Sequence, residues 1–376
     1  MEFLVDLECF KKAISDVNKA VSQKTAFPIL TGIKITVTED CLTLVGSNSN
    51  IVIKKEIPLM IDDVTVLEVF ETGSVVISAK YLYEIVKKLS SKVHLRVNEK
   101  NIVTIQSDEI VTNLYGFHAD EYPDLPQIDE GNAIKIPSMD LIEVIKQTVF
   151  AVSKSEARPA LTGVNMSVKD YQLTCVATNS QRLALRKLTV ESNINGSFIV
   201  PSTSLNELTS LINKDSGVIH IFVSDSYMLF KSHSISLFSR LIQGNYPNIT
   251  GLLPNKSDTT ITLNTNQFLK GIDRACLFAS EWKNNNVHLE INDGSKIKIY
   301  SNSSQIGKIE ETQAIVAIDG DSSLRISLDG TFLIDTLKVI KEEQVRLSFG
   351  GSLRPVLIEP LDNSSYLHLI SPVRSY

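Results

Sequence analysis

Ala20-Val21-Ser22-Gln23-Lys24-Thr25-Ala26-Phe27-Pro28-Ile29-Leu30-Thr31-Gly32 returns 131 residues later as Ala151-Val152-Ser153-Lys154-Ser155-Glu156-Ala157-Arg158-Pro159-Ala160-Leu161-Thr162-Gly163, with eight of the thirteen positions identical. The likeness continues without a gap to Ser49 and Ser180, which gives 14 identities in 30 positions. A match of this length between two parts of one chain indicates a repeated structural unit.

The repeat extends beyond this stretch and has a third, fainter copy. Gly73–Ile77 matches Gly196–Val200, and Glu121-Tyr122-Pro123 matches Asn245-Tyr246-Pro247. In the third copy, Phe268–Ile272 follows the pattern of Phe10–Ile14. The period of about 125 residues is the size of a self-contained domain rather than of a solenoid unit. We therefore predict three tandem domains of one fold, at residues 1–127, 128–254 and 255–376.

The hydrophobic spacing within one repeat predicts its secondary structure. Apolar residues three or four apart predict amphipathic helices over 7–21 and 82–89. Alternating or β-branched runs predict strands at 33–37, 42–45, 51–53, 93–97 and 102–105. Short turns separate consecutive strands, which favours antiparallel pairing. The predicted class is α+β, with the order helix, strands, helix, strands in each domain.

The composition is that of an ordinary globular protein. The 376 residues include 37 Lys and Arg against 43 Asp and Glu, for a net charge of −6, which argues against disorder. No apolar run approaches the 18 residues of a membrane-spanning helix. The start, Met1–Asp6, has neither the basic nor the apolar region of a signal peptide. We expect a cytoplasmic protein.

Cysteines and histidines give no sign of a metal or redox site. Cys9, Cys41, Cys175 and Cys276 lie far apart in apolar segments, so we expect small buried thiols. The six histidines are equally scattered. We expect no metal and no cofactor.

The motifs of common enzymes are missing. The sequence has no P-loop, no nucleotide-binding glycine motif after a strand, no nucleophile elbow and no zinc-protease motif. Asp62-Asp63 and Asp319-Gly320-Asp321 are expected in loops, and Gly350-Gly351 in a hairpin turn. An enzyme with a site between domains is the weaker alternative to a binding protein.

Basic residues recur on the polar faces of the predicted helices. The segment 80–92 holds four lysines against one glutamate, and every repeat has further basic residues at non-core helix positions. Each helix alone is explained by a solvated face, but the recurrence suggests a basic surface for a polyanion. No aromatic platform accompanies it, which disfavours single-strand binding and favours non-specific contact with duplex phosphates.

Several motifs resemble one known family. They are Arg158–Gly163, Thr178-Asn179-Ser180-Gln181-Arg182-Leu183-Ala184, Gly244-Asn245-Tyr246-Pro247, Glu121–Pro126 and Ser371-Pro372-Val373-Arg374. Together they resemble the bacterial DNA polymerase III beta subunits, the sliding clamps, over the whole chain and in the same order.

The resemblance implies a non-catalytic head-to-tail homodimer that forms a closed ring. Helices would form the inner wall and antiparallel sheet the outer wall, with duplex DNA threaded through the hole and held by topology. The implied partners are the polymerase III catalytic subunit, the clamp loader, other polymerases, ligase and mismatch-repair proteins, all bound through short peptides. Such a protein would work on the nucleoid, in the cytoplasm.

The resemblance also assigns residues to three surfaces. The peptide groove would be lined by Leu161, Thr178, Ser180, Arg182, Leu183, Pro247, Leu252, Phe332, Leu353, Pro355, Leu369, Ile370, Pro372, Val373 and Arg374. In it, Thr178 and Arg182 would fix the orientation of the peptide. Lys24, Lys80 and Arg158 would face DNA, and Leu114 and Phe278 would lie at the dimer interface.

This sequence departs from the family pattern at the implied groove. Asn179 and Gln181 stand where the family commonly has aspartate and histidine, and Ser371 replaces a bulky apolar residue. These changes suggest altered partner affinity. They leave open that the chain is a divergent second clamp that serves repair or stress polymerases beside a main one.

Overall fold

The computed structural model describes residues 1–376 except 23–24, 253–255, 280–284, 293, 306 and 374–376. The chain forms two compact units. Unit 1 comprises Met1–Met139, Glu191–Asn193 and Thr203–Leu241, and unit 2 comprises Asp140–Val190, Ile194–Ser202 and Ile242–Tyr376. The boundary between the units passes through the middle repeat, so the division into three domains stays a prediction of the sequence repeat.

Unit 1 contains a five-stranded, an eight-stranded and a two-stranded sheet. The first has the order β11 (Ile110–Tyr115), β10 (Ile102–Ser107), β9 (Val93–Val97), β1 (Glu2–Val5), β7 (Leu67–Glu71). The second has the order β12 (Ile134–Pro137), β17 (Val218–Val223), β18 (Tyr227–Lys231), β19 (Ile235–Arg240), β4 (Ile51–Pro58), β3 (Cys41–Ser47), β2 (Gly32–Val37), β8 (Gly73–Ser78). The third pairs β5 (Met60–Ile61) with β6 (Val64–Thr65). The helices are α1 (Leu7–Asn18), α2 (Ala79–Val86), most of α4 (Ser202–Leu211), η1 (Pro28–Thr31), η2 (Ala119–Glu121) and η5 (Lys214–Ser216).

Unit 2 contains a nine-stranded and a four-stranded sheet. The larger has the order β16 (Gly196–Pro201), β13 (Gly163–Lys169), β14 (Gln172–Thr178), β15 (Arg182–Thr189), β28 (Tyr366–Ile370), β27 (Val356–Pro360), β26 (Gln344–Phe349), β20 (Thr259–Asn264), β24 (Ala317–Gly320). The smaller has the order β23 (Gly307–Ala314), β22 (Lys296–Ser303), β21 (Asn286–Ile291), β25 (Leu324–Asp329). The helices are most of α3 (Ser138–Thr148), α5 (Thr265–Ala279), α6 (Gly330–Val339), η3 (Val149–Ala151), η4 (Pro159–Thr162) and η6 (Thr250–Leu252).

The predicted α+β class is confirmed. The strands pair antiparallel throughout the described part of the chain. Two pairings join one repeat to the next: β4 with β19 in unit 1, and β15 with β28 in unit 2. We call them the first and the second junction.

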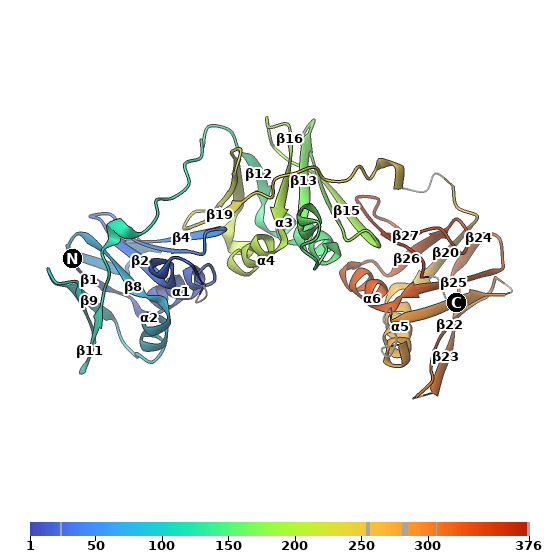
Figure 1. Ribbon diagram of the computed structural model, residues 1–376, viewed down its shortest axis with the longest axis horizontal. Coiled ribbons are helices and arrows are strands. Elements are labelled where there is room, and N and C mark those ends of the chain that lie inside the picture. Colours follow the sequence, from blue (N-terminus) through green and yellow to red (C-terminus); the bar gives the residue numbers. More distant parts are fainter. Residues whose placement is uncertain (23–24, 253–255, 280–284, 293, 306, 374–376) are drawn as a thin grey trace. The chain divides into compact units, whose positions relative to one another are not determined.

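The first helix shows how the apolar spacing builds the core. The Asp6 carboxylate caps α1 by accepting a hydrogen bond from the Cys9 N–H at 3.0 Å. Phe10 and Ile14 are buried, and α1 packs beside α2 against strands of the eight-stranded sheet (Figure 1). Both helices end earlier than predicted, at Asn18 and at Val86.

The quoted repeat forms a short helical turn that leads into a strand in both copies. The Thr31 hydroxyl donates to the Pro28 carbonyl at 2.8 Å, and the Thr162 hydroxyl donates to the Pro159 carbonyl at the same distance. A Cβ on Gly32 would lie 2.5 Å from Val76 Cγ1, and one on Gly163 would lie 2.7 Å from the Val200 carbonyl oxygen. This close strand approach explains why glycine ends both copies.

The turn predictions are partly confirmed. Asp62 and Asp63 have positive φ and form the turn between β5 and β6, and Gly350-Gly351 connects the antiparallel β26 and β27. The loop prediction for Asp319-Gly320 is wrong, because both residues pair with β20 as part of β24.

The expectation of four buried thiols is also partly wrong. Cys175 is buried, but Cys9, Cys41 and Cys276 are half-buried because they lie at the margins of their elements. The described residues contain no cluster of potential metal ligands. None of the described helices has the length and apolar character needed to cross a membrane.

Candidate functional site

The second junction carries an apolar cluster on one face of the nine-stranded sheet. Leu183 on β15 lies opposite Leu369 on β28, and both are buried with Val176 and Leu185. Tyr246, Ile249, Leu357 and Leu367 pack against them and remain partly accessible. The structure thus brings together two predicted groove residues with neighbours that sequence reasoning did not name.

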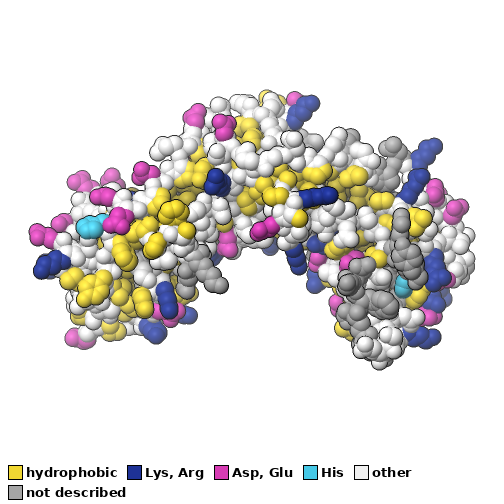
Figure 2. Space-filling model, in the orientation of Figure 1, with side chains coloured by type: hydrophobic (Ala, Val, Ile, Leu, Met, Phe, Trp, Pro, Cys, Tyr) yellow, Lys and Arg dark blue, Asp and Glu magenta, His cyan; other side chains and the backbone are white. Residues whose placement is uncertain are grey.

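Exposed apolar side chains accompany this cluster in unit 2. Leu252 is 54% exposed and Leu353 is 76% exposed; Pro247 is exposed, and Pro355 and Pro372 are half-buried. On the face seen in Figure 2, hydrophobic side chains gather over the part of unit 2 that holds β15 and β27. Large exposed aliphatic side chains beside a partly open apolar cluster are typical of a peptide-binding surface.

Four predicted groove residues serve the protein's own packing. Ile370 is fully buried in the core of unit 2 and pairs with Val356 and Arg182. Leu161 is also buried, Phe332 packs against the same core as Ile370, and the Val373 N–H donates to the Ser327 carbonyl at 2.8 Å. Arg374 lies outside the described residues.

The turn before β15 is closed by its own polar side chains. The Thr178 hydroxyl donates to the Arg182 carbonyl at 2.6 Å and accepts from the Ser180 N–H at 3.1 Å. The Asn179 side-chain oxygen accepts from the N–H groups of Gln181 and Arg182, both at 2.9 Å. Ser180 is exposed and has a φ of 77°. The Thr178 hydroxyl therefore already bonds within the turn, and its role in orienting a peptide stays a prediction.

Arg182 is likewise committed within the protein. Its side chain is 8% exposed and forms an ion pair with Asp335 at 2.7 Å. It also donates to the Phe150 carbonyl and lies over the rings of Phe150 and Phe332, at 5.3 Å and 4.4 Å. Its charge is neutralised and its planar face is covered within the chain, and a role in orienting a bound peptide stays a prediction. Arg182 fastens the second repeat to the third.

A buried histidine lies behind the same junction. His368 on β28 is 1% exposed, and its ring contacts the rings of Phe150 and Tyr366. Burial lowers the pKa of His368 from its ordinary value of 6.5 to about 3. Neither ring nitrogen has a hydrogen-bond partner among the described residues, so the imidazole is neutral and acts as packing.

Sequence reasoning missed Asp335 and Phe150, which hold Arg182. Asp335 lies 153 residues further along the chain, so no local pattern connects them. A signal was nevertheless present, because the position that corresponds to Arg182 in the first repeat is the buried Ile51. An arginine in place of a core isoleucine requires a partner specific to the second junction.

The structure describes two of the three residues that are expected to face DNA. Lys80 is exposed on α2, with its ammonium 5.7 Å from the Tyr81 ring centroid, and Arg158 is exposed directly before η4. Lys24 lies outside the described residues. Among the other basic residues, Arg274 on α5 donates two hydrogen bonds to Glu311, and Lys341, which follows α6, pairs with Glu143 at 3.0 Å. In unit 1, Lys11 likewise pairs with Glu8 at 3.2 Å.

Of the two expected interface residues, Leu114 lies on an edge strand and Phe278 lies on a helix that packs against another edge strand. Leu114 is half-buried on β11, the edge strand of the five-stranded sheet, which also exposes Ile110, Val111 and Tyr115. Phe278 is half-buried on α5. That helix packs against β22 and β23, and β23 is the edge strand of the four-stranded sheet.

These features define a class of protein: a chain of repeated α+β domains with a partly open apolar cluster at one junction and unpaired sheet edges. Sequence profiles of the N-terminal, central and C-terminal domains of the DNA polymerase III beta subunit match residues 1–126, 135–248 and 250–374. The chain belongs to the DNA polymerase III beta subunit family.

Similar proteins span the whole chain. The beta sliding clamp of Bacillus subtilis is 42% identical and that of Staphylococcus aureus is 38% identical, with 100% of both chains covered in each case. The crystal structure of the Bacillus subtilis DNA polymerase sliding clamp matches with a TM-score of 0.97 at 41% identity. The beta subunit of Streptococcus pyogenes matches with a TM-score of 0.95 at 33% identity, and both structures are covered completely.

Proposed function

We propose that this protein is a DNA sliding clamp, a non-catalytic processivity factor that tethers DNA polymerase III and other DNA enzymes to duplex DNA. The observation that carries the proposal is the full-length likeness to beta sliding clamps, and the partly open apolar cluster at the second junction supports it. The function needs no cofactor, and it places the protein on the nucleoid in the cytoplasm.

The working form is a head-to-tail homodimer. β11 and β23 are both edge strands with unpaired backbone groups, and such edges can be covered by pairing with another chain. Pairing β11 of one copy with β23 of the second would cover exposed Val111 and Tyr115. With Leu114 and Phe278 at the two contacts, the ring would close and no edge would be left to extend a filament.

DNA is held by enclosure rather than by affinity. The chain has a net charge of −6, so it has no overall attraction to a polyanion, and the lysines on α1 and α2 supply only local positive charge. Lys24, Lys80 and Arg158 belong to this DNA-facing surface. Contacts with phosphates carry no sequence information and weaken with salt, which permits sliding.

Partners bind through short peptides at the second junction. The lining consists of Leu183 and Leu369 as the floor, with Leu252, Leu353, Pro247, Pro355 and Pro372 around it. An extended peptide with two or three apolar side chains would bury them against these residues. The same groove would serve the polymerase III catalytic subunit, the clamp loader, other polymerases, ligase and mismatch-repair proteins in turn.

The test is retention on circular against linear DNA. The protein is loaded onto a nicked plasmid by a clamp loader, and the plasmid is then cut once at moderate salt. A clamp stays on the circle and leaves after the cut. Retention on both forms would show ordinary DNA binding and would overturn the proposal.

A second candidate function is that of a divergent clamp for repair or stress polymerases. The N–H of Ser371 donates to the Gln181 carbonyl at 2.8 Å, so two of the departures from the family pattern are in direct contact beside the groove. Primer extension decides between the two functions: a main clamp supports long products with the replicative polymerase, whereas a divergent one does not. Binding of the host polymerase's peptide with ordinary micromolar affinity would also exclude the divergent clamp.

A further inference from the structure

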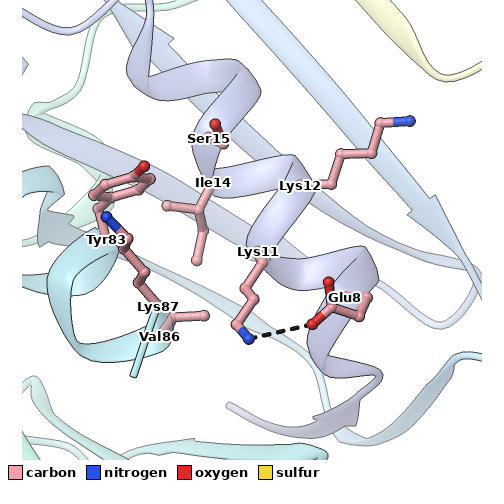
Figure 3. A pocket seen from close by; sticks show the side chains of 8 residues that line it. All are labelled: Glu8, Lys11, Lys12, Ile14, Ser15, Tyr83, Val86 and Lys87. Atoms are coloured by element: carbon pink, nitrogen blue, oxygen red, sulfur yellow. Dashed lines mark hydrogen bonds and ion pairs between the residues drawn. The ribbon is translucent and has the colours of Figure 1, made fainter. Parts of the chain in front are cut away.

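A pocket of about 260 Å³ lies between α1 and α2 of unit 1, apart from both the groove and the sheet edges. Its lining comes from one face of each helix: Glu8, Lys11, Lys12, Ile14, Ser15, Tyr83, Val86 and Lys87. Figure 3 shows Tyr83 and Lys87 of α2 on one side and the residues of α1 on the other.

The interior of the pocket is apolar. Ile14 is fully buried and Val86 is 1% exposed, and the side chains of both residues line the space between the helices (Figure 3). The Tyr83 ring forms part of the wall and the Lys11 stem another part. Because Ile14 and Val86 have almost no accessible surface, a flat apolar group would displace water from the half-buried Tyr83 ring and Lys11 stem.

The rim of the pocket is cationic. Lys11, Lys12 and Lys87 stand against one carboxylate, Glu8, which pairs with Lys11 at 3.2 Å and is 80% exposed. Among the described residues, Lys12 and Lys87 have no ion-pair partner, and the Lys87 ammonium lies 5.8 Å from the Tyr83 ring centroid. Ser15 adds a hydroxyl. The site therefore favours a ligand with a negative charge next to a flat apolar body.

We propose that this pocket binds one nucleotide unit, with the base against the Tyr83 ring and the phosphate beside the Lys87 ammonium, since the Lys11 ammonium already bonds to Glu8 and the Leu89 carbonyl. A nucleotide joins an aromatic ring to a phosphate within one small molecule, as the two parts of the pocket require. No local sequence pattern predicts such a site, because Tyr83 and Lys11 lie 72 residues apart and meet only where α1 packs on α2. The nucleotide could be free or part of a single strand.

The test is calorimetric titration of the full-length protein at low salt with thymidine monophosphate, thymidine and inorganic phosphate. We expect the monophosphate to bind at least about tenfold more tightly than either fragment, because base and phosphate each add affinity. Tyr83→Ala should weaken it about tenfold and Lys87→Ala several-fold. Tyr83→Phe keeps the ring and should keep the affinity, which separates loss of stacking from loss of folding.

Matched controls lie on and beside the same helix. Tyr81→Ala removes an exposed ring and Lys88→Ala removes an exposed ammonium, and neither residue lines the pocket. Both should bind the monophosphate like the unaltered protein. If phosphate alone binds as tightly as the monophosphate, or if Tyr83→Ala and Tyr81→Ala behave alike, the proposal is wrong.

The source of the nucleotide is decided by competition. A 5′-phosphorylated oligothymidylate that displaces the monophosphate identifies a DNA strand as the ligand, and failure to displace it identifies a free nucleotide. The titration uses neither clamp loader nor plasmid. Its failure therefore leaves the clamp function untouched, and a failed plasmid test leaves this site untouched.

Discussion

The two junctions are built from corresponding strands, and both have half-buried apolar side chains, but the second is accompanied by the strongly exposed Leu252 and Leu353. In the first, a row of side chains crosses the sheet through Val52, Phe238, Leu229, Phe222 and Ala133. In the second, the corresponding row is Leu183, Leu369, Leu357, Ser348 and Thr260. Phe222 is thus replaced by Ser348, which removes an aromatic ring from the surface of the sheet.

The segment that follows each Tyr-Pro motif completes the difference. After Tyr122, Leu125 and Ile128 pack onto the first row. After Tyr246, the equivalent Ile249 packs onto the second row, but the equivalent Leu252 stays 54% exposed. The chain therefore covers its first junction more fully than its second, where we propose that a partner peptide binds. At the first junction, Phe222 in the row and the two side chains of Leu125 and Ile128 cover the sheet. At the second, Ser348 replaces the ring and only Ile249 of the corresponding pair packs against the row.

The largest expected effect comes from the polar contacts that Arg182 makes across the second junction. Arg182→Ala leaves the Asp335 carboxylate and the Phe150 carbonyl without their partner, so it should lower the free energy of unfolding by about 3 kcal/mol. Lys231→Ala, at the exposed Lys231–Glu130 pair of unit 1, should cost at most about 1 kcal/mol. Urea unfolding followed by circular dichroism measures both. Equal losses would show that Arg182 does not fasten the junction.

Ser348→Phe should convert the second junction toward the first. The added ring would lie beside Leu357 and fill the space available to a peptide, so partner-peptide affinity should fall about thirtyfold, or about 2 kcal/mol. Ser348→Ala keeps the space and should bind normally. Fluorescence polarisation with a labelled peptide from the host polymerase compares the two. Unchanged affinity in Ser348→Phe would mean that Ser348 does not set the opening.

The double substitution Leu125→Ala and Ile128→Ala should uncover the first junction. Both side chains are half-buried against the aromatic row, so the free energy of unfolding should fall by about 2 kcal/mol. The affinity of the second junction for the peptide should not change, because the two junctions lie in different compact units. A loss of peptide binding in this variant would contradict that independence.

A smaller expected effect is a pH dependence of the free energy of unfolding that comes from His368 at the second junction. The folded state keeps His368 neutral down to a pKa of about 3, whereas the unfolded chain takes up the proton near pH 6.5. Stability is therefore lost as the pH falls below 6.5, and this residue accounts for about 1.4 kcal/mol between pH 7.5 and 5.5. His368→Leu should remove that part of the pH dependence. The free energy of unfolding of both proteins is measured by urea unfolding at each pH, and the difference between them gives the contribution of His368. The same pH dependence in both proteins would refute this contribution.

Much of the fold could be predicted from the sequence, because its repeats and apolar periods are local. The antiparallel strands and the glycine that ends the quoted motif follow from such patterns. Leu183 and Leu369, which the resemblance named together, do lie opposite each other in one apolar cluster. The contacts of Arg182 could not be predicted, because only folding brings Asp335 and Phe150 near to it. The Thr178 hydroxyl bonds to groups two and four residues along the chain, but no sequence motif predicted these bonds. Ile370 shows the same limit: alternation along a strand does not tell which face is the core when both faces are apolar.

Counting and mapping the bound peptide tests the account most directly. The protein is titrated calorimetrically with the clamp-binding peptide of the host's polymerase III catalytic subunit. The unaltered protein, Leu353→Ala and the Leu125→Ala, Ile128→Ala double variant are compared. We predict one peptide per chain, about tenfold weaker binding in Leu353→Ala because its exposed side chain would be buried by the peptide, and no change in the double variant. Two peptides per chain, or a loss in the double variant with none in Leu353→Ala, would show that the partner binds at the first junction and would contradict the account.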